Sequence, residues 1–205
     1  MVNNMNVLKA ENINFGYGSN QVLKNLNFEM DNSQIIGLFG DSGSGKSTFC
    51  KILNGFIKDY EGTVSVNGQV HKKGFNPIQL IYQHPEKAMN PRWKMEEVLK
   101  ESWMPDEKLL NEFGIKKEWF NRYPSELSGG ELQRFNILRS LNPETKFIIA
   151  DEISTMLDAL TQVQIWNSLS DIARKNQVGM LVVSHDKNLL NRICDKTVYL
   201  SDITE

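Results

Sequence analysis

The chain has 205 residues, with 23 Lys and Arg against 25 Asp and Glu, and a formal net charge of −2. This length predicts one domain with its own core, and the charge balance argues against nucleic-acid binding by bulk charge. Two cysteines, Cys50 and Cys194, are too few for a disulfide scaffold and predict small buried residues in a reducing compartment. Without a leader-like start or a membrane-length apolar run, we expect a soluble cytoplasmic protein that reaches membranes only through a partner.

The first predicted elements are strands. Three strand-like stretches, residues 7–14, 22–28 and 62–66, lie between Gly- and Asn-rich turns and predict an antiparallel edge layer. The strand at residues 34–39 instead runs into a Gly-rich loop and a helix over residues 46–56. Such a strand–loop–helix unit is typical of the α/β class.

The middle of the chain differs from what precedes it. After a short strand over residues 80–82, no good strand is predicted before residue 128, and this stretch holds three of the four tryptophans. Helices are predicted over residues 94–101, 106–113 and 131–141. We interpret residues 84–140 as a helical insertion whose aromatic side chains form a small local core.

The rest of the chain returns to alternating strands and helices. These are predicted over residues 147–150, 159–175, 178–183, 187–193 and 197–200. Residues 1–83 and 141–205 are therefore expected to form the core of one α/β domain that contains the insertion.

The loop after residue 39 matches the phosphate-loop pattern G-x-x-x-x-G-K-[ST]. Its glycines let backbone amides turn toward phosphate oxygens, and the following helix adds a partial positive charge. Lys46 is placed to reach the β- and γ-phosphates, Ser47 to ligate Mg²⁺, and Thr48 to support the α-phosphate end. The alternative, a flexible Gly/Ser loop, does not explain the strand before it and the helix after it. The loop consists of Gly40, Asp41, Ser42, Gly43, Ser44, Gly45, Lys46, Ser47 and Thr48.

An apolar strand ending in two acids, Asp151 and Glu152, predicts a second part of the site. Ligands of parallel sheets lie beyond the carboxyl ends of the strands, so Asp151 is expected near the Mg²⁺, holding it through water. Glu152 is placed to polarise an attacking water molecule. A solvated acidic turn is the alternative, and the phosphate loop in the same chain weakens it.

A second Gly-rich loop, Ser128-Gly129-Gly130, opens a predicted helix. Ser128 and Glu131 fit a helix capping box, but a cap needs no pair of glycines. Two exposed glycines at a helix start form an anion cradle. Because the nucleotide already has its own phosphate loop, this second cradle suggests contact with a nucleotide held by another subunit.

Together these segments resemble the ATP-binding subunits of ABC transporters. LSGGELQR resembles the signature motif of that family, and GDSGSGKST and FIIADE resemble its Walker A and Walker B motifs. Leu157-Asp158 resembles the end of the D-loop, and Ser184-His185-Asp186 resembles the switch-histidine segment. The resemblance covers residues 7–200. It implies a RecA-like P-loop NTPase core with a mainly parallel sheet, an N-terminal antiparallel β layer and an inserted helical subdomain.

The resemblance also implies a role for individual residues. Tyr17 stacks on the adenine, Gln83 joins the Mg²⁺ shell and senses the membrane partner, and Glu152 is the general base. His185 contacts the γ-phosphate and steadies the attacking water. The γ-phosphate of ATP held by the opposite subunit is bound by Ser128, Gly129 and Gly130. The alternatives are an exposed turn tyrosine for Tyr17, a strand-end amide for Gln83 and a surface histidine for His185, and the family context favours the functional roles.

The family context implies an ATPase that uses ATP and Mg²⁺ and pairs with an identical or homologous ATP-binding subunit. It also implies membrane permease partners, an extracytoplasmic solute-binding protein, a place on the inner face of the membrane, and no direct contact with nucleic acid. Two stretches, residues 82–92 and 122–124, together with residues 158–165, resemble the peptide and nickel importer branch. The transported solute is not encoded in this chain.

One segment departs from the family pattern. After Glu152 the chain reads Ile-Ser-Thr-Met, where the family usually has Pro-Thr-Ser-Ala. The missing proline frees the turn after the base, and Met156 is bulkier than alanine at the dimer contact. These changes put the rate and the fit of the interface in question, but not ATP binding.

Two other functions stay open at this point. A non-transport ABC ATPase acting on DNA or ribosomes usually has a long coiled-coil insert or two ATPase units, and the sequence shows neither feature. A phosphoryl-transferring kinase leaves the Ser-Gly-Gly loop and His185 without a role.

Overall fold

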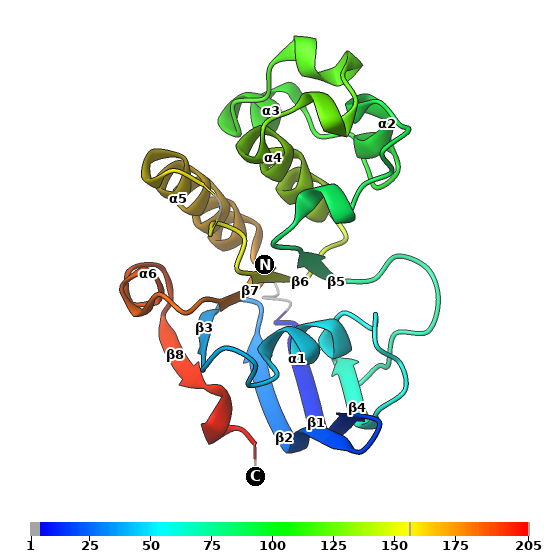
Figure 1. The fold of residues 1–205 in the computed structure, drawn as a ribbon, viewed down its shortest axis with the longest axis vertical. Coiled ribbons are helices and arrows are strands. Elements are labelled where there is room, and N and C mark those ends of the chain that lie inside the picture. Colours follow the sequence, from blue (N-terminus) through cyan, green and yellow to red (C-terminus); the bar gives the residue numbers. More distant parts are fainter. Residues whose placement is uncertain (1–4, 156, 205) are drawn as a thin grey trace.

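The N-terminal region forms an antiparallel sheet in the computed structural model, which describes residues 5–155 and 157–204. Its strands are β1 (Val7–Tyr17), β2 (Asn20–Asp31) and β4 (Glu61–Val66), in the spatial order β2-β1-β4. The predicted edge layer is confirmed, although β1 and β2 extend further than the apolar pattern suggested. Figure 1 shows this sheet at the bottom of the molecule.

A second, parallel sheet crosses the middle of the molecule (Figure 1). Its strand order is β5-β6-β7-β3-β8, so β3 lies beside β7 although β7 comes much later in the chain. Every residue of β7 is buried, and the first four residues of β3 and β6 are buried as well. Continuous apolar runs of this kind are expected for strands covered on both faces. The strands are β3 (Ile35–Phe39), β5 (Ile78–Ile81), β6 (Phe147–Asp151), β7 (Gly179–Val183) and β8 (Lys196–Tyr199).

Helix α1 (Lys46–Leu53) packs in the core between the two sheets. Phe49 and Cys50 are fully buried in a cluster with side chains from both sheets. The helix ends three residues earlier than expected because the chain turns at Gly55, whose φ of 75° lies in the left-handed region. Phe56, which we expected inside the helix, is instead 69% exposed.

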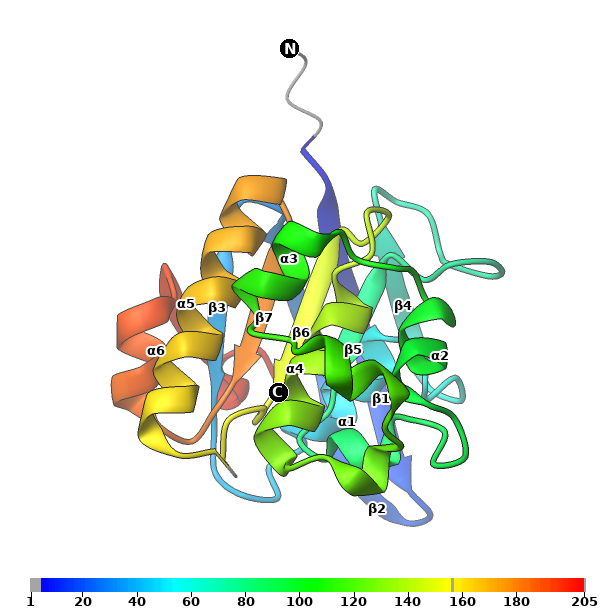
Figure 2. The same cartoon turned by 90° about the horizontal axis from the view of Figure 1, so that it is seen from above.

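Helices α5 (Ala159–Asn176) and α6 (Lys187–Ile193) agree with the sequence patterns to within a residue. Figure 2 shows both helices beside the parallel sheet on the side of β3 and β7. The last predicted strand ends at Tyr199, and Leu200–Asp202 form a 3-10 turn. No helix among residues 5–155 and 157–204 has the length and apolar character needed to cross a bilayer.

The helical segment contains α2 (Met95–Lys100), α3 (Glu107–Glu112) and α4 (Gly129–Ser140), with 3-10 turns before α2 and between α3 and α4. It stands at the top of Figure 1, away from the antiparallel sheet. We expected the aromatic side chains of this segment to form a small local core, but they are part of a larger one. Trp119 and Phe135 belong to one buried cluster that continues through α5 to β6 and β7. Helix α4 causes this continuity, because its buried side chains pack against α2, α5 and β5.

Both cysteines are free thiols, as the sequence predicted. Cys50 is fully buried and Cys194 is partly buried. Burial raises the pKa of the Cys194 thiol to about 12, so this thiol stays protonated at physiological pH.

Candidate nucleotide site

The phosphate loop joins β3 to α1, and two of its glycines have backbones that other residues rarely adopt. Gly43 has a φ of 79° and Gly45 a φ of 107°. A Cβ atom on Gly45 would lie 2.9 Å from Cγ1 of Val22, so a side chain is excluded there by space as well as by conformation. Gly45 is the N-cap of α1, and the first-turn amides after it have no partner within the helix. The loop therefore presents amides and a helix N-terminus to an anion.

Lys46 lies across the mouth of this loop. Its Nζ atom donates hydrogen bonds to the carbonyl oxygens of Gly40 at 2.6 Å and Asp41 at 2.7 Å. The residue is only 6% exposed. Because a buried ammonium needs acceptors, phosphate oxygens are natural replacements for these two carbonyls.

Asp151 ends β6 beside the loop and carries an unused acceptor. Its Oδ1 atom is buried and has no hydrogen-bond partner among the described residues. Burial raises the pKa of this carboxyl, and the charge of Glu152 adds to the effect, whereas a hydrogen bond from the Ser47 hydroxyl opposes it. A carboxylate and a hydroxyl side by side are oxygen ligands of the kind that Mg²⁺ prefers. These two residues therefore fit a Mg²⁺ ion.

Asp151→Asn should stabilise the protein when no divalent cation is present. The pKa of Asp151 is higher in the folded than in the unfolded chain, so binding of a proton to this carboxylate stabilises the folded state, and this stabilisation is fully present at low pH. That stability is lost as the pH rises through the folded pKa. At pH 7.5 in chelator, thermal unfolding should show a Tm higher by about 2–4 °C for the variant. The gap should shrink as the pH falls toward the ordinary aspartate pKa. A lower Tm at pH 7.5 would show that the buried carboxylate is already well compensated.

Glu152 and His185 follow neighbouring strands of the parallel sheet and meet at its carboxyl edge. His185 Nδ1 lies 3.4 Å from Oε1 of Glu152. The Glu152 backbone has a φ of 49° and donates its amide hydrogen to the carbonyl of Val183 at 3.0 Å. Non-glycine residues in this region cost about 1 kcal/mol or more, and such strain is often found at functional sites. The bond to β7 holds Glu152 in this conformation.

Gln83 joins the same group through a residue that the sequence did not single out. Its Nε2 atom donates to the hydroxyl of Thr155 at 3.0 Å, and that hydroxyl donates to the Glu152 carbonyl at 3.1 Å. Gln83, Ser47 and Asp151 line one open cavity of about 640 Å³. In the sequence, Thr155 is part of the departing turn, and a hydroxyl three residues after Glu152 is its only signal.

The departing turn is anchored without a proline. Ile153 is 2% exposed and packs into the main core, where it holds the start of the turn. Met156, whose size we had questioned, lies outside the described residues.

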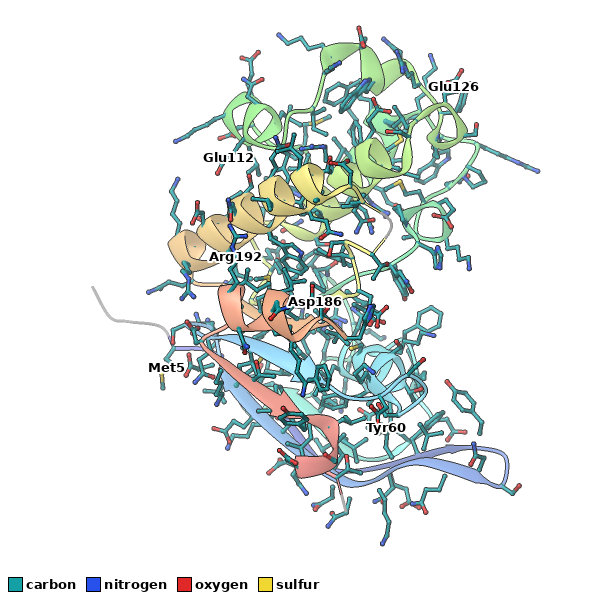
Figure 3. All side chains as sticks on the ribbon, turned by 60° about the vertical axis from the view of Figure 1, so that its left-hand side comes forward. Met5, Tyr60, Glu112, Glu126, Asp186 and Arg192 are labelled. Carbon is teal, nitrogen blue, oxygen red and sulfur yellow. The ribbon has the colours of Figure 1, made fainter. Side chains whose placement is uncertain are left out.

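The Ser-Gly-Gly loop lies apart from the phosphate loop. Ser128 and Glu131 form the predicted capping box, with bonds of 2.8 and 3.3 Å. A Cβ atom on Gly129 would meet open space. The loop lines an open cavity of about 570 Å³ with Leu157 and Asp158, and no residue of the phosphate loop contributes to that cavity. Figure 3 shows Glu126, just before this loop, near the top of the helical segment, and Asp186, at the start of α6, near the middle of the molecule.

The remaining predicted residues are also accessible. Tyr17 is 56% exposed and meets Phe15 edge to face, with ring centroids 4.9 Å apart. Asp158 caps α5, and hydrogen bonds from the Thr161 side chain and amide lower the pKa of its carboxyl. The structure thus brings the phosphate loop, Gln83, Asp151, Glu152 and His185 to one edge of the parallel sheet. Tyr17 and the Ser-Gly-Gly loop stand outside that group.

Comparison with known proteins identifies the family. Residues 23–155 match the family model described as ABC transporter. The nickel import system ATP-binding protein NikE of Staphylococcus aureus is 31% identical over 96% of this chain and 87% of its own length.

Solved structures share the fold. The ATP-binding subunit of an ABC transporter superposes with a TM-score of 0.80 at 24% identity, over 94% of this chain and 85% of its own. A dimeric ATP-binding cassette in a post-hydrolysis state with ADP and Pi gives 0.78 at 24% identity, over 94% and 93%. The family match and the NikE relative show that the chain belongs to the ABC transporter family, as an ATPase subunit.

Proposed function

We propose that this subunit powers the import of a small solute, of the nickel or peptide class, through partner permeases in the membrane. The NikE relative supports the nickel class, and the importer-like stretches around Gln83 support the branch as a whole. An extracytoplasmic solute-binding protein would deliver the solute, and the chain would sit on the inner face of the membrane by binding the permeases.

The observation that carries the catalytic part is the unused buried oxygen of Asp151 beside the Ser47 hydroxyl. In the proposed site, Ser47, Gln83 and Asp151 hold Mg²⁺, which supplies charge neutralisation for the phosphates when it is bound. Lys46 and the loop amides bind the β- and γ-phosphates. Glu152 accepts the proton of the attacking water. His185, whose Nδ1 lies 3.4 Å from the Glu152 carboxylate, orients that carboxylate and the water.

Tyr17 is the proposed adenine contact. Its side chain is largely exposed and therefore accessible to a base, while the edge-to-face contact with Phe15 limits its motion. Tyr17→Ala should weaken ATP binding about tenfold, because stacking on an aromatic side chain contributes about 1–3 kcal/mol per base. Calorimetric titration with ATP measures this directly. Tyr17→Phe keeps the ring and serves as the control, so an equal loss in both variants would contradict stacking.

The separate Ser-Gly-Gly cavity supports a dimer. Since the phosphate loop and residues 128–130 line different cavities in one chain, we propose that each binds the same ATP from opposite subunits. We also propose that residues 84–140 act as a helical subdomain that carries this second cradle. The partner is an identical chain or a homologous ATP-binding subunit.

Purification of the tagged chain from its native membranes tests the transport role. We expect permease subunits to co-purify, and we expect Mg²⁺-dependent phosphate release that rises when the solute and its binding protein are added. Phosphate release without permeases, together with co-purifying ribosomes or DNA, would overturn the transport role while leaving the ATPase intact.

A further inference from the structure

Two buried side-chain amides on α4 share one acceptor at the end of β5. Gln133 Nε2 and Asn136 Nδ2 donate to the carbonyl oxygen of Tyr82, at 3.4 and 3.2 Å. The two donors are 1% and 3% exposed. We call these three groups the amide clasp.

The clasp occupies positions where apolar side chains would be expected. Leu132, Phe135 and Ile137, its neighbours on α4, are all buried core residues. Burying an amide is unfavourable unless it is hydrogen-bonded, and Gln133 Oε1 has no partner among the described residues. Packing alone therefore does not explain why α4 carries two amides at this place.

What the clasp connects gives a reason for it. Gln133 lies one turn after the Gly129–Gly130 pair, on the same rigid helix. Tyr82 immediately precedes Gln83, whose side chain is bonded to Thr155 and through it to the Glu152 carbonyl. A path of hydrogen bonds, joined in the middle by the covalent link between Tyr82 and Gln83, thus runs from α4 to Glu152, the acid that directly follows β6.

We propose that Gln133 and Asn136 are positioning residues that tie Gln83 to the helix carrying the Ser-Gly-Gly cradle. When α4 shifts as the cradle closes on the partner's ATP, the clasp moves the Tyr82 carbonyl and brings Gln83 into place in this chain's own site. This inference rests on the proposed function, because it assumes that both sites handle ATP.

The test uses Asn136→Leu, which removes one donor and keeps the branched shape at a larger volume, and Asn136→Asp, which also keeps the size if the first variant folds poorly. Ser140→Ala is the matched control, since its buried hydroxyl lies one turn further on α4 and bonds to the Asn136 carbonyl, not to Tyr82. Loss of this hydrogen bond should lower kcat about fivefold to tenfold with little change in the KM for ATP. Ser140→Ala should keep the wild-type kcat.

Hydrogen exchange gives a readout that a merely structural role would not change. With Glu152→Gln added to retain ATP, MgATP should protect residues 128–134 and 80–87 together when the clasp is intact. In the Asn136 variants, residues 128–134 should still become protected while residues 80–87 no longer respond. If both segments respond as in Ser140→Ala and kcat is unchanged, the clasp inference is wrong although the ATPase stands. If the wild-type chain neither binds nor hydrolyses ATP, the proposed function fails and the clasp inference with it.

Discussion

Glu152→Gln is expected to bind MgATP normally and to lose nearly all turnover. The amide keeps the shape of the side chain and its place 3.4 Å from His185, but it cannot accept the proton of the attacking water. General base catalysis typically contributes about 10²–10⁴-fold, so phosphate release should fall by that range. Single-turnover measurement of phosphate release at saturating ATP isolates this step.

The same variant should accumulate the ATP-bound dimer, because the step that reopens it is blocked. Glu144→Gln, a change of the same kind at an exposed loop position before β6, should leave the rate unchanged. Turnover of Glu152→Gln within a few-fold of wild type would remove the base assignment and point to another acceptor at the site.

Lys46→Ala is expected to weaken ATP binding about 100-fold. The ammonium donates to two carbonyl oxygens of the loop, and each charge-assisted hydrogen bond that it makes to phosphate instead is worth about 1.5 kcal/mol or more. Calorimetric titration of the variant with ATP gives the change in Kd.

The matched control is Lys175→Ala, which removes an exposed lysine at the end of α5 and should bind ATP normally. The thermal unfolding of Lys46→Ala must be compared with that of the wild type, because Lys46 also makes hydrogen bonds within the phosphate loop. A folded Lys46→Ala protein with wild-type affinity would mean that the amides alone hold the phosphates.

The sequence was sufficient for the order of the elements and for the residues at the sheet edge. Buried parallel strands leave continuous apolar runs, and residues directly after such strands must meet at one edge. That is why the strand pattern alone predicts Asp151 and Glu152 at this edge, whereas His185 is expected there only from the resemblance to the ABC family. The end of α1 was misplaced because periodicity continues through Phe56, whereas the backbone turns at Gly55.

Sequence patterns do not predict hydrogen bonds between residues that are far apart in the chain. Gln83 and Thr155 are separated by 72 positions, and Gln133 meets Tyr82 across 51. Neither pair has a spacing rule, because their approach depends on how α4 and the turn after β6 pack against β5. The left-handed backbone of Glu152 was likewise unpredictable, since it is imposed by a bond to β7.

The most direct measurement follows backbone amides at the two cradles when ATP binds. Gly129 and Gly130 open α4, so their amides have no partner within the helix and should exchange rapidly in the free chain. MgATP is added to Glu152→Gln in the presence of its partner ATP-binding subunit. Residues 128–130 should then become protected together with residues 40–48, as the two ATPase subunits form a dimer. Protection confined to residues 40–48 at every protein concentration, with residues 128–130 still exchanging freely, would contradict an ATP held between two chains.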